Sequence, residues 1–256
     1  MILGAGFNAN GLAEAGMGVD VGDINRNGLL DIFVTNYSGE TNTLYLNQGH
    51  GLFLDETDFK GLGRPSFHFL AFGTKFVDLN LDGWLDLYVG NGHVIDNINL
   101  FNNQYSHRQH DQIYMNESGT FTDQTKLIRL DNQDKFVTRG VASADIDNDG
   151  DIDLIISNNN DEASLLINEG VPQNNWIGFY LKGVEANRQA IGSKIKIHTN
   201  SGSQVSYVNP SGSYLSSNDQ RIVFGLGKEE KVKMVEIFWA GGTEKEILSF
   251  PNLKCA

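Results

Sequence analysis

The stretch that decides the fold is GVDVGDINRNGLLDIFV, residues 18–34. It aligns without gaps to GTKFVDLNLDGWLDLYV at residues 73–89 and to GVASADIDNDGDIDLII at residues 140–156. Each copy carries a Gly five residues before its first Asp, followed by the pattern D-x-[DN]-x-[DN]-G-x-x-D. Self-similarity at a spacing of tens of residues is typical of repeat architectures. The sequence therefore predicts three related units.

The segments that flank the three loops also repeat. Each loop runs into a short apolar stretch, and a second such stretch later ends at Asn47, Asn116 or Asn168. Short apolar stretches bounded by Gly and Asn turns are typical of β-strands. The first Asp of the loop recurs after 55 and then 67 residues, and the longer unit carries an insert around residues 96–110. Repeats of this size that contain only short strands predict an all-β fold with a partial β-propeller of about three blades.

The three loops have the ligand chemistry of a calcium site. A hard divalent cation takes about six to eight oxygen ligands, and alternate positions of one loop can all point inward. Positions one, three, five and nine supply side-chain oxygens, the Gly at position six allows the turn, and position seven supplies a backbone carbonyl. We therefore expect three Ca²⁺ sites. Their predicted ligands are Asp23, Asn25, Asn27, Leu29 and Asp31; Asp78, Asn80, Asp82, Trp84 and Asp86; and Asp145, Asp147, Asp149, Asp151 and Asp153.

An EF-hand, a zinc or magnesium site and a simple turn each fit these loops less well than calcium. A helical EF-hand requires Glu at position twelve, where this chain has Val34, Val89 and Ile156. Ligands that are all oxygen disfavour zinc, and a cage of many protein oxygens suits Ca²⁺ better than Mg²⁺. Asp, Asn and Gly are also turn formers, but three loops with identical spacing and matching flanks are not explained by turns alone. Because the number of carboxylates rises from the first loop to the third, we expect calcium affinity to rise in the same order.

The charge of the chain narrows the class of partner and divides the sequence in two. Its 256 residues hold 32 acidic and 19 basic side chains, a net charge of −13, which disfavours nucleic acid and anionic membranes as partners. Residues 1–173 carry 25 acidic and 9 basic residues, whereas residues 174–256 carry 7 and 10, so we place a domain boundary after residue 173.

The single Cys255 excludes an intramolecular disulfide. No apolar stretch reaches the roughly 20 residues of a membrane-spanning helix.

The loops resemble the calcium loops of FG-GAP/VCBS-type repeats, the kind found in integrin α-subunit propellers. The FG of that motif corresponds to Phe72 and Gly73, and the resemblance covers about residues 18–170. The stretches NNWIG, NRQAIGS, GSYLS, FGLG and WAGGT, which begin at residues 174, 187, 212, 224 and 239, resemble the ASPIC/UnbV domain. The combination is similar to the cartilage acidic protein family. The resemblance implies a calcium-stabilised propeller, located extracellularly, in the periplasm or at the cell surface, that serves adhesion or binds a protein or glycan ligand.

The C-terminal residues 174–256 are also informative without this resemblance. Short stretches rich in β-branched and aromatic residues, separated by Gly, Ser and Asn turns, predict an all-β module of about 80 residues. Together with the resemblance, we expect a small β-sandwich-like ASPIC/UnbV domain. These stretches are residues 176–181, 194–198, 204–208, 221–224 and 232–239. Residues 194–198 alternate strictly between Lys or His and Ile, which predicts one solvated face.

Three repeats are fewer than a closed propeller needs. Closed propellers have about four to eight blades, and an open fan exposes strand edges. The first residues lack the basic and long apolar regions of a signal peptide. We therefore expect the chain to be the C-terminal portion of a longer propeller protein or the product of a truncated gene model.

The sequence offers little catalytic chemistry. His107 and His110 form an H-x-x-H in the insert, which is compatible with a metal site or with a polar surface loop. His93 follows the second calcium strand and is compatible with a turn role, and Trp84 with blade packing or carbohydrate stacking. No G-x-S-x-G elbow or P-loop is present. We expect a non-enzymatic protein; the alternative is an enzyme or biosynthetic accessory protein, such as an enediyne-cluster protein or a propeller hydrolase, which a His/Asp pair in an axial pocket would favour.

Overall fold

The computed structural model describes residues 4–128, 135–171, 173–184, 187–241 and 245–248. Almost every regular element in these residues is a β-strand, so the predicted all-β class is confirmed. The helical elements of the described residues are three short turns: α1 (Gly63–Ser66), η1 (Ile98–Leu100) and η2 (Thr125–Ile128). Among the described residues, no helix is long and apolar enough to cross a membrane.

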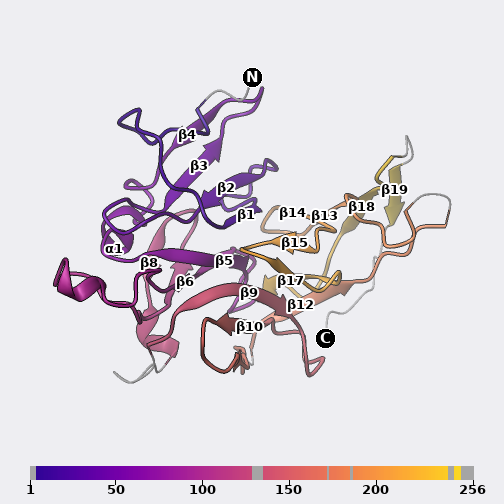
Figure 1. Ribbon diagram of the computed structural model, residues 1–256. Coiled ribbons are helices and arrows are strands. Elements are labelled where there is room, and N and C mark those ends of the chain that lie inside the picture. Colours follow the sequence, from indigo (N-terminus) through magenta and orange to yellow (C-terminus); the bar gives the residue numbers. More distant parts are fainter. Residues whose placement is uncertain (1–3, 129–134, 172, 185–186, 242–244, 249–256) are drawn as a thin grey trace.

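The repeats form three antiparallel sheets that fan out side by side as propeller-like blades (Figure 1). Within each blade the strands pair in chain order. The first blade contains β1 (Val19–Gly22), β2 (Asp31–Val34), β3 (Thr43–Asn47) and β4 (Phe53–Asp55). The second contains β5 (Ala71–Val77), β6 (Asp86–Asn91), β7 (Gln112–Asn116) and β8 (Phe121–Asp123). The third contains β9 (Thr138–Ala144), β10 (Asp153–Asn158) and β11 (Ser164–Leu166).

The repeated loops are the hairpin connections between the first two strands of each blade. The register places the last residue before the loop opposite the loop's ninth residue, as in Gly22 opposite Asp31. The Gly at position six has positive φ in all three loops, between 86° and 96°, a conformation that costs Gly little. All three loops therefore lie at corresponding ends of their blades.

The Gly that precedes each of the first two loops allows the inner strands to approach one another. A Cβ at Gly18 would collide with the carbonyl oxygen of Phe72 in the next blade. A Cβ at Gly73 would lie 2.9 Å from the carbonyl oxygen of Arg139 in the third blade. In the first two repeats the Gly is therefore explained by blade-to-blade packing, whereas a Cβ at Gly140 of the third would lie 2.6 Å from the hydroxyl oxygen of Ser216 in the C-terminal residues.

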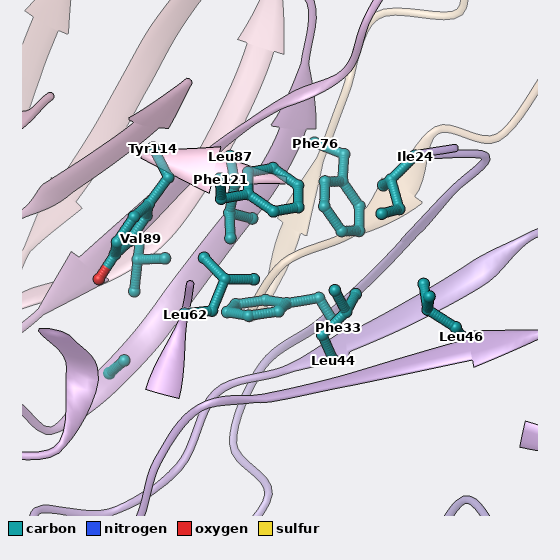
Figure 2. Packing of buried hydrophobic residues seen from close by; sticks show 11 residues of the cluster. Ile24, Phe33, Leu44, Leu46, Leu62, Phe76, Leu87, Val89, Tyr114 and Phe121 are labelled. Carbon is teal, nitrogen blue, oxygen red and sulfur yellow. The ribbon is translucent and has the colours of Figure 1, made fainter. Parts of the chain in front are cut away.

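The first and second blades share one hydrophobic core, shown in Figure 2. Phe121 of β8 stacks on Phe76 of β5 with ring centroids 6.5 Å apart, and both are almost fully buried. The core consists of Ile24, Phe33, Leu44, Leu46, Leu62, Ala71, Phe76, Leu87, Val89, Tyr114 and Phe121. Burial of this apolar surface, which contributes about 25 cal/mol of stability per Å², holds the two blades together.

The C-terminal residues form a second β module with its own core. A four-stranded sheet has the order β14-β13-β18-β19, and β12 pairs with β17. The strands are β12 (Asn175–Phe179), β13 (Lys194–His198), β14 (Ser203–Tyr207), β17 (Ile222–Gly227), β18 (Met234–Phe238) and β19 (Lys245–Leu248). Ile195 and Ile197 of β13 are fully buried while their Lys and His neighbours are partly exposed, which confirms the predicted alternation.

A hairpin of the C-terminal module, β15 (Ser211–Gly212) and β16 (Ser216–Ser217), lies against the inner strands of the blades. Its Ser213 donates its backbone N–H to the carbonyl of Val19 in the first blade at 2.8 Å. The Ser213 hydroxyl oxygen accepts the N–H groups of Thr74 and Val141, in the second and third blades, at 3.1 and 3.2 Å. One residue therefore joins all three blades, and the hairpin covers inner-strand edges that a bare fan would expose.

Candidate metal site

In the first two loops, the Asp at position one is satisfied by the loop's own backbone. The two oxygens of Asp23 accept the N–H groups of Asn27 and Gly28 at 3.0 and 2.8 Å. Asp78 does the same with Asp82 and Gly83, at 3.1 and 2.7 Å. Such charge-assisted bonds fix the loop in its turn conformation.

The Asp at position nine has the same structural role in all three loops. In the second loop, Asp86 accepts the N–H of Leu79 at 3.0 Å and that of Asn116, at the end of β7, at 2.8 Å. Asp31 and Asp153 accept the corresponding pairs of N–H groups in their own blades. The carboxylate thus ties the start of each loop to the third strand of the same blade.

The Asn at the end of the third strand links neighbouring blades. The side-chain amide of Asn116 donates to the carbonyl of Ile24, in the first loop, at 3.0 Å. The amide of Asn168 donates to the carbonyl of Leu79, in the second loop, at 2.8 Å. These Asn residues recur at the same place in each repeat of the sequence, but the sequence does not indicate which groups they bind.

The third loop differs from the other two in its carboxylates. One oxygen each from Asp145, Asp147 and Asp149 lies within 4.8 Å of the others. Asp145 is buried, and its Oδ1 atom has no hydrogen-bond partner. A buried carboxylate oxygen without a partner is costly, and a cation bound among three converging carboxylates would satisfy it. The donor set of this loop therefore fits a hard divalent cation.

The loop carboxylates are in surroundings that disfavour their ionised form unless a positive charge lies nearby. Burial raises the pKa of Asp31 to about 6, of Asp78 to about 7 and of Asp86 to about 8. In the third loop, burial and then the neighbouring carboxylates, Asp149 first, raise the pKa of Asp151 to about 6. Each shift means that the ionised carboxylate is disfavoured where it lies.

The predicted position-seven residues differ in their surroundings. Asp151 is buried, and its backbone N–H donates to Asp149 at 2.9 Å. Trp84 lies under the Arg26 guanidinium, whose carbon is 4.1 Å from the ring centroid. Trp84 thus packs between the first two loops, and no described contact assigns it a carbohydrate. Carbonyl coordination by Leu29, Trp84 and Asp151 remains a prediction.

Two arginines that sequence reasoning missed contact the loops: one links the first two loops, and the other links the third loop to the C-terminal module. Arg26, at position four of the first loop, donates to the carbonyls of Asp82 and Gly83 in the second loop, both at 2.9 Å. Arg221 of the C-terminal module donates to the Asp145 carbonyl and to the Asn148 side chain of the third loop. These contacts join segments far apart in the chain, so no local pattern indicates them.

The candidate histidines lie apart from the loops. His93 is fully buried, and its Nδ1 accepts the N–H of Ile95 at 3.0 Å. Its own backbone N–H donates to the carbonyl of His107 at 2.9 Å. The H-x-x-H metal site at His107 and His110 remains a prediction. The cleft beside the hairpin, between Lys75 and Asp145, has no histidine among its described lining residues.

The fold and the loops define a class of protein, an all-β repeat protein whose blades each carry one oxygen-rich loop. The FG-GAP-like repeat family model matches residues 23–89 and 78–156, which together span more than half of the chain. The chain belongs to this FG-GAP-like repeat family. The ASPIC and UnbV family model matches residues 183–252, so the resemblances in both parts of the chain are confirmed.

Among individual relatives, the chain is similar to cartilage acidic protein 1. It is 26% identical to the mouse protein over 279 residues, which cover 89% of this chain and 42% of the relative. The human protein is 26% identical over 278 residues, covering 89% and 41%, and that of Xenopus tropicalis is 24% identical over 277 residues, covering 89% and 42%. The chain thus spans about two fifths of the length of these relatives.

Proposed function

We propose that this chain is a calcium-binding, non-enzymatic recognition module of an extracellular protein. The observation that carries the proposal is the third loop, where three carboxylates converge and the buried Asp145 Oδ1 atom has no partner. The FG-GAP-like repeats support binding to a protein ligand, and the cartilage proteins it resembles support an extracellular location. Adhesion, or recognition of a protein or glycan, is the function that fits a fold with no assembled catalytic group among its described residues.

Calcium would neutralise and stiffen the loops. In the third loop it would be held by Asp145, Asp147 and Asp149, with the same positions of the first two loops holding two further ions. The third loop also contacts Arg221 of the C-terminal module. An ordered third loop would therefore fix the C-terminal module against the blades.

Thermal unfolding of the full chain tests the metal part of the proposal. We expect Ca²⁺ to raise the melting temperature over the chelator-treated protein, and Mg²⁺ to raise it less, because a ligand that binds only the folded state stabilises that state. The double variant Asp147→Asn, Asp149→Asn should lose most of this gain, whereas Asp96→Asn, an exposed acid outside the loops, should keep it. A melting temperature insensitive to Ca²⁺ would refute the metal proposal.

The recognition part is tested separately. We expect binding to immobilised extracellular-matrix proteins or to a glycan array to be saturable with calcium and weakened by a chelator. Calcium-dependent stability without binding on either surface would leave a structural metal site and refute the recognition role.

A further inference from the structure

In the part of the chain that the structure describes, the third blade has three strands, whereas the first two blades have four. Both fourth strands follow the pattern G-x-F-x-D-x-T, at residues 51–57 and 119–125. In the third blade the chain instead turns at Gly170 and continues through Val171 towards β12 of the C-terminal module. Among the described residues β11 pairs only with β10, so its outer edge has no described strand partner.

The second blade shows what a fourth strand contributes. β8 pairs with β7 so that Phe121 lies opposite Asn116 and Asp123 opposite Tyr114. The backbone N–H of Phe121 also donates to the carbonyl of Lys60, in the connection between the first two blades, at 2.9 Å. The Phe121 ring is 3% exposed because it fills the space between those blades (Figure 2). The strand therefore completes the sheet edge and the inter-blade core together.

A groove of about 680 Å³ lies at the matching place between the second and third blades. Five of its lining residues are Leu79, Ile113, Met115, Leu154 and Leu166. In the repeat alignment they correspond to Ile24, Leu44, Leu46, Leu87 and Tyr114, all of which are core residues between the first and second blades. The groove is thus lined by the equivalents of those core residues. Among the described residues, however, none takes the place of Phe121.

We propose that this groove accepts an extended segment of a partner polypeptide with the G-x-F-x-D-x-T pattern. The segment adds to β11 as an antiparallel fourth strand, with its Phe opposite Asn168 and its Asp opposite Leu166. Addition of a strand to a free sheet edge provides backbone hydrogen bonds, and a side-chain pocket provides specificity. The Phe ring enters the groove between Met115 and Leu166.

The same chain supports this choice of occupant. In both existing fourth strands the Asp and Thr form a local turn that ends the strand: the Thr57 N–H donates to Asp55 at 3.0 Å, and the Thr125 N–H to Asp123 at 2.9 Å. The Asp and Thr thus set the length of the strand, and the Phe takes the place in the groove that the buried Phe121 has between the first two blades. The nearby exposure of Leu165 and Ile167, 52% and 47%, provides further apolar surface beside the free edge.

A peptide-binding experiment tests the proposal. The probe is a fluorescein-labelled peptide of residues 118–125, SGTFTDQT, titrated with the full chain and followed by fluorescence anisotropy. We expect saturable binding that weakens at least about tenfold in the Phe121→Ala peptide, since the ring supplies the buried surface. The protein variant Met115→Lys should weaken binding similarly, whereas Leu100→Lys, at a 76% exposed site elsewhere, should not.

Two outcomes overturn the proposal. If the peptide does not bind, or if the Phe121→Ala peptide binds with the same affinity, the groove does not recognise this pattern. If Met115→Lys does not fold, by its circular dichroism spectrum, the two peptides compared on the unsubstituted protein still decide the question. A dimer of the unsubstituted protein that Met115→Lys dissociates in sedimentation would assign the groove to a second copy instead of a partner.

Discussion

The third repeat differs from the first two in its loop and in its sheet. In the first two loops, backbone N–H groups satisfy the position-one Asp, whereas Asp145 of the third has an oxygen with no partner. The first two blades have four strands each, and the third has three in the part of the chain that the structure describes. One sequence pattern therefore occurs in two arrangements: in two loops the position-one Asp already accepts backbone N–H groups, and in the third it has an oxygen left for a cation.

The difference between the loops is expected to have its largest effect on calcium affinity. Asp145→Ala should weaken the tightest site by about 100-fold or more, because it removes a carboxylate from a partly buried cluster. Asp23→Ala, at the same position of the first loop, should leave that tightest site unchanged. Isothermal titration of the chelator-treated protein measures both. A tightest site that survives Asp145→Ala and is lost in Asp23→Ala would reverse the order.

The connection between the second and third strands of a blade offers a second contrast, between a neutral and an ionisable side chain. In the first blade Asn42 accepts the N–H of Asn36 at 2.9 Å. At the same place in the second blade, Asp111 accepts the N–H of Asn91 at 2.7 Å, and also the hydroxyls of Tyr88 and Thr138. Burial raises the pKa of Asp111 from 3.8 to about 6.

This contrast predicts a pH effect with a definite sign. Between pH 3.8 and 6 Asp111 is protonated more in the folded than in the unfolded chain, so its contribution to the free energy of unfolding falls as pH rises. The loss is complete above about pH 6 and amounts to about 3 kcal/mol, of which about 2 kcal/mol falls between pH 4.5 and 7.5. Asp111→Asn, which copies the neutral amide of Asn42, should remove it. Urea unfolding with chelator at pH 4.5 and 7.5 measures the change, and equal pH dependence in both proteins would contradict the assignment.

Local pattern predicted much of this architecture. The strands, the loops and the position-six Gly follow from residues within about ten positions of one another, where periodicity and turn chemistry operate. The contacts that join repeats were not predictable in this way. Asn116 reaches Ile24 across 92 positions and Ser213 reaches Thr74 across 139, and both use polar groups that many turns contain. The metal-ligand assignments remain predictions from spacing, now with one loop whose geometry fits them.

The third contrast is between the blade-linking Asn of the second blade and its counterpart in the first. Asn116 donates to Ile24 and Leu85, whereas the Asn47 side chain donates to the carbonyl of Leu30 in its own blade. Asn116→Ala should lower the free energy of unfolding by about 2 kcal/mol and Asn47→Ala by about 1 kcal/mol, because a buried carbonyl left without a donor carries a penalty. Equal losses in urea unfolding would show that the link between blades adds nothing.

The smallest effect is expected at Ser213, whose hydroxyl accepts one backbone N–H from the four-stranded second blade and one from the three-stranded third blade. Ser213→Ala removes the acceptor of the Thr74 and Val141 N–H groups and should cost about 1 kcal/mol, since both amides are buried there. Ser217→Ala, on an exposed residue of the same hairpin, is the control. Native-state hydrogen exchange should show faster exchange at both amides, one in the second blade and one in the third. Acceleration confined to Val141 would mean that the Ser213 hydroxyl stabilises only the three-stranded blade. The difference between the repeats would then extend to their contacts with the hairpin.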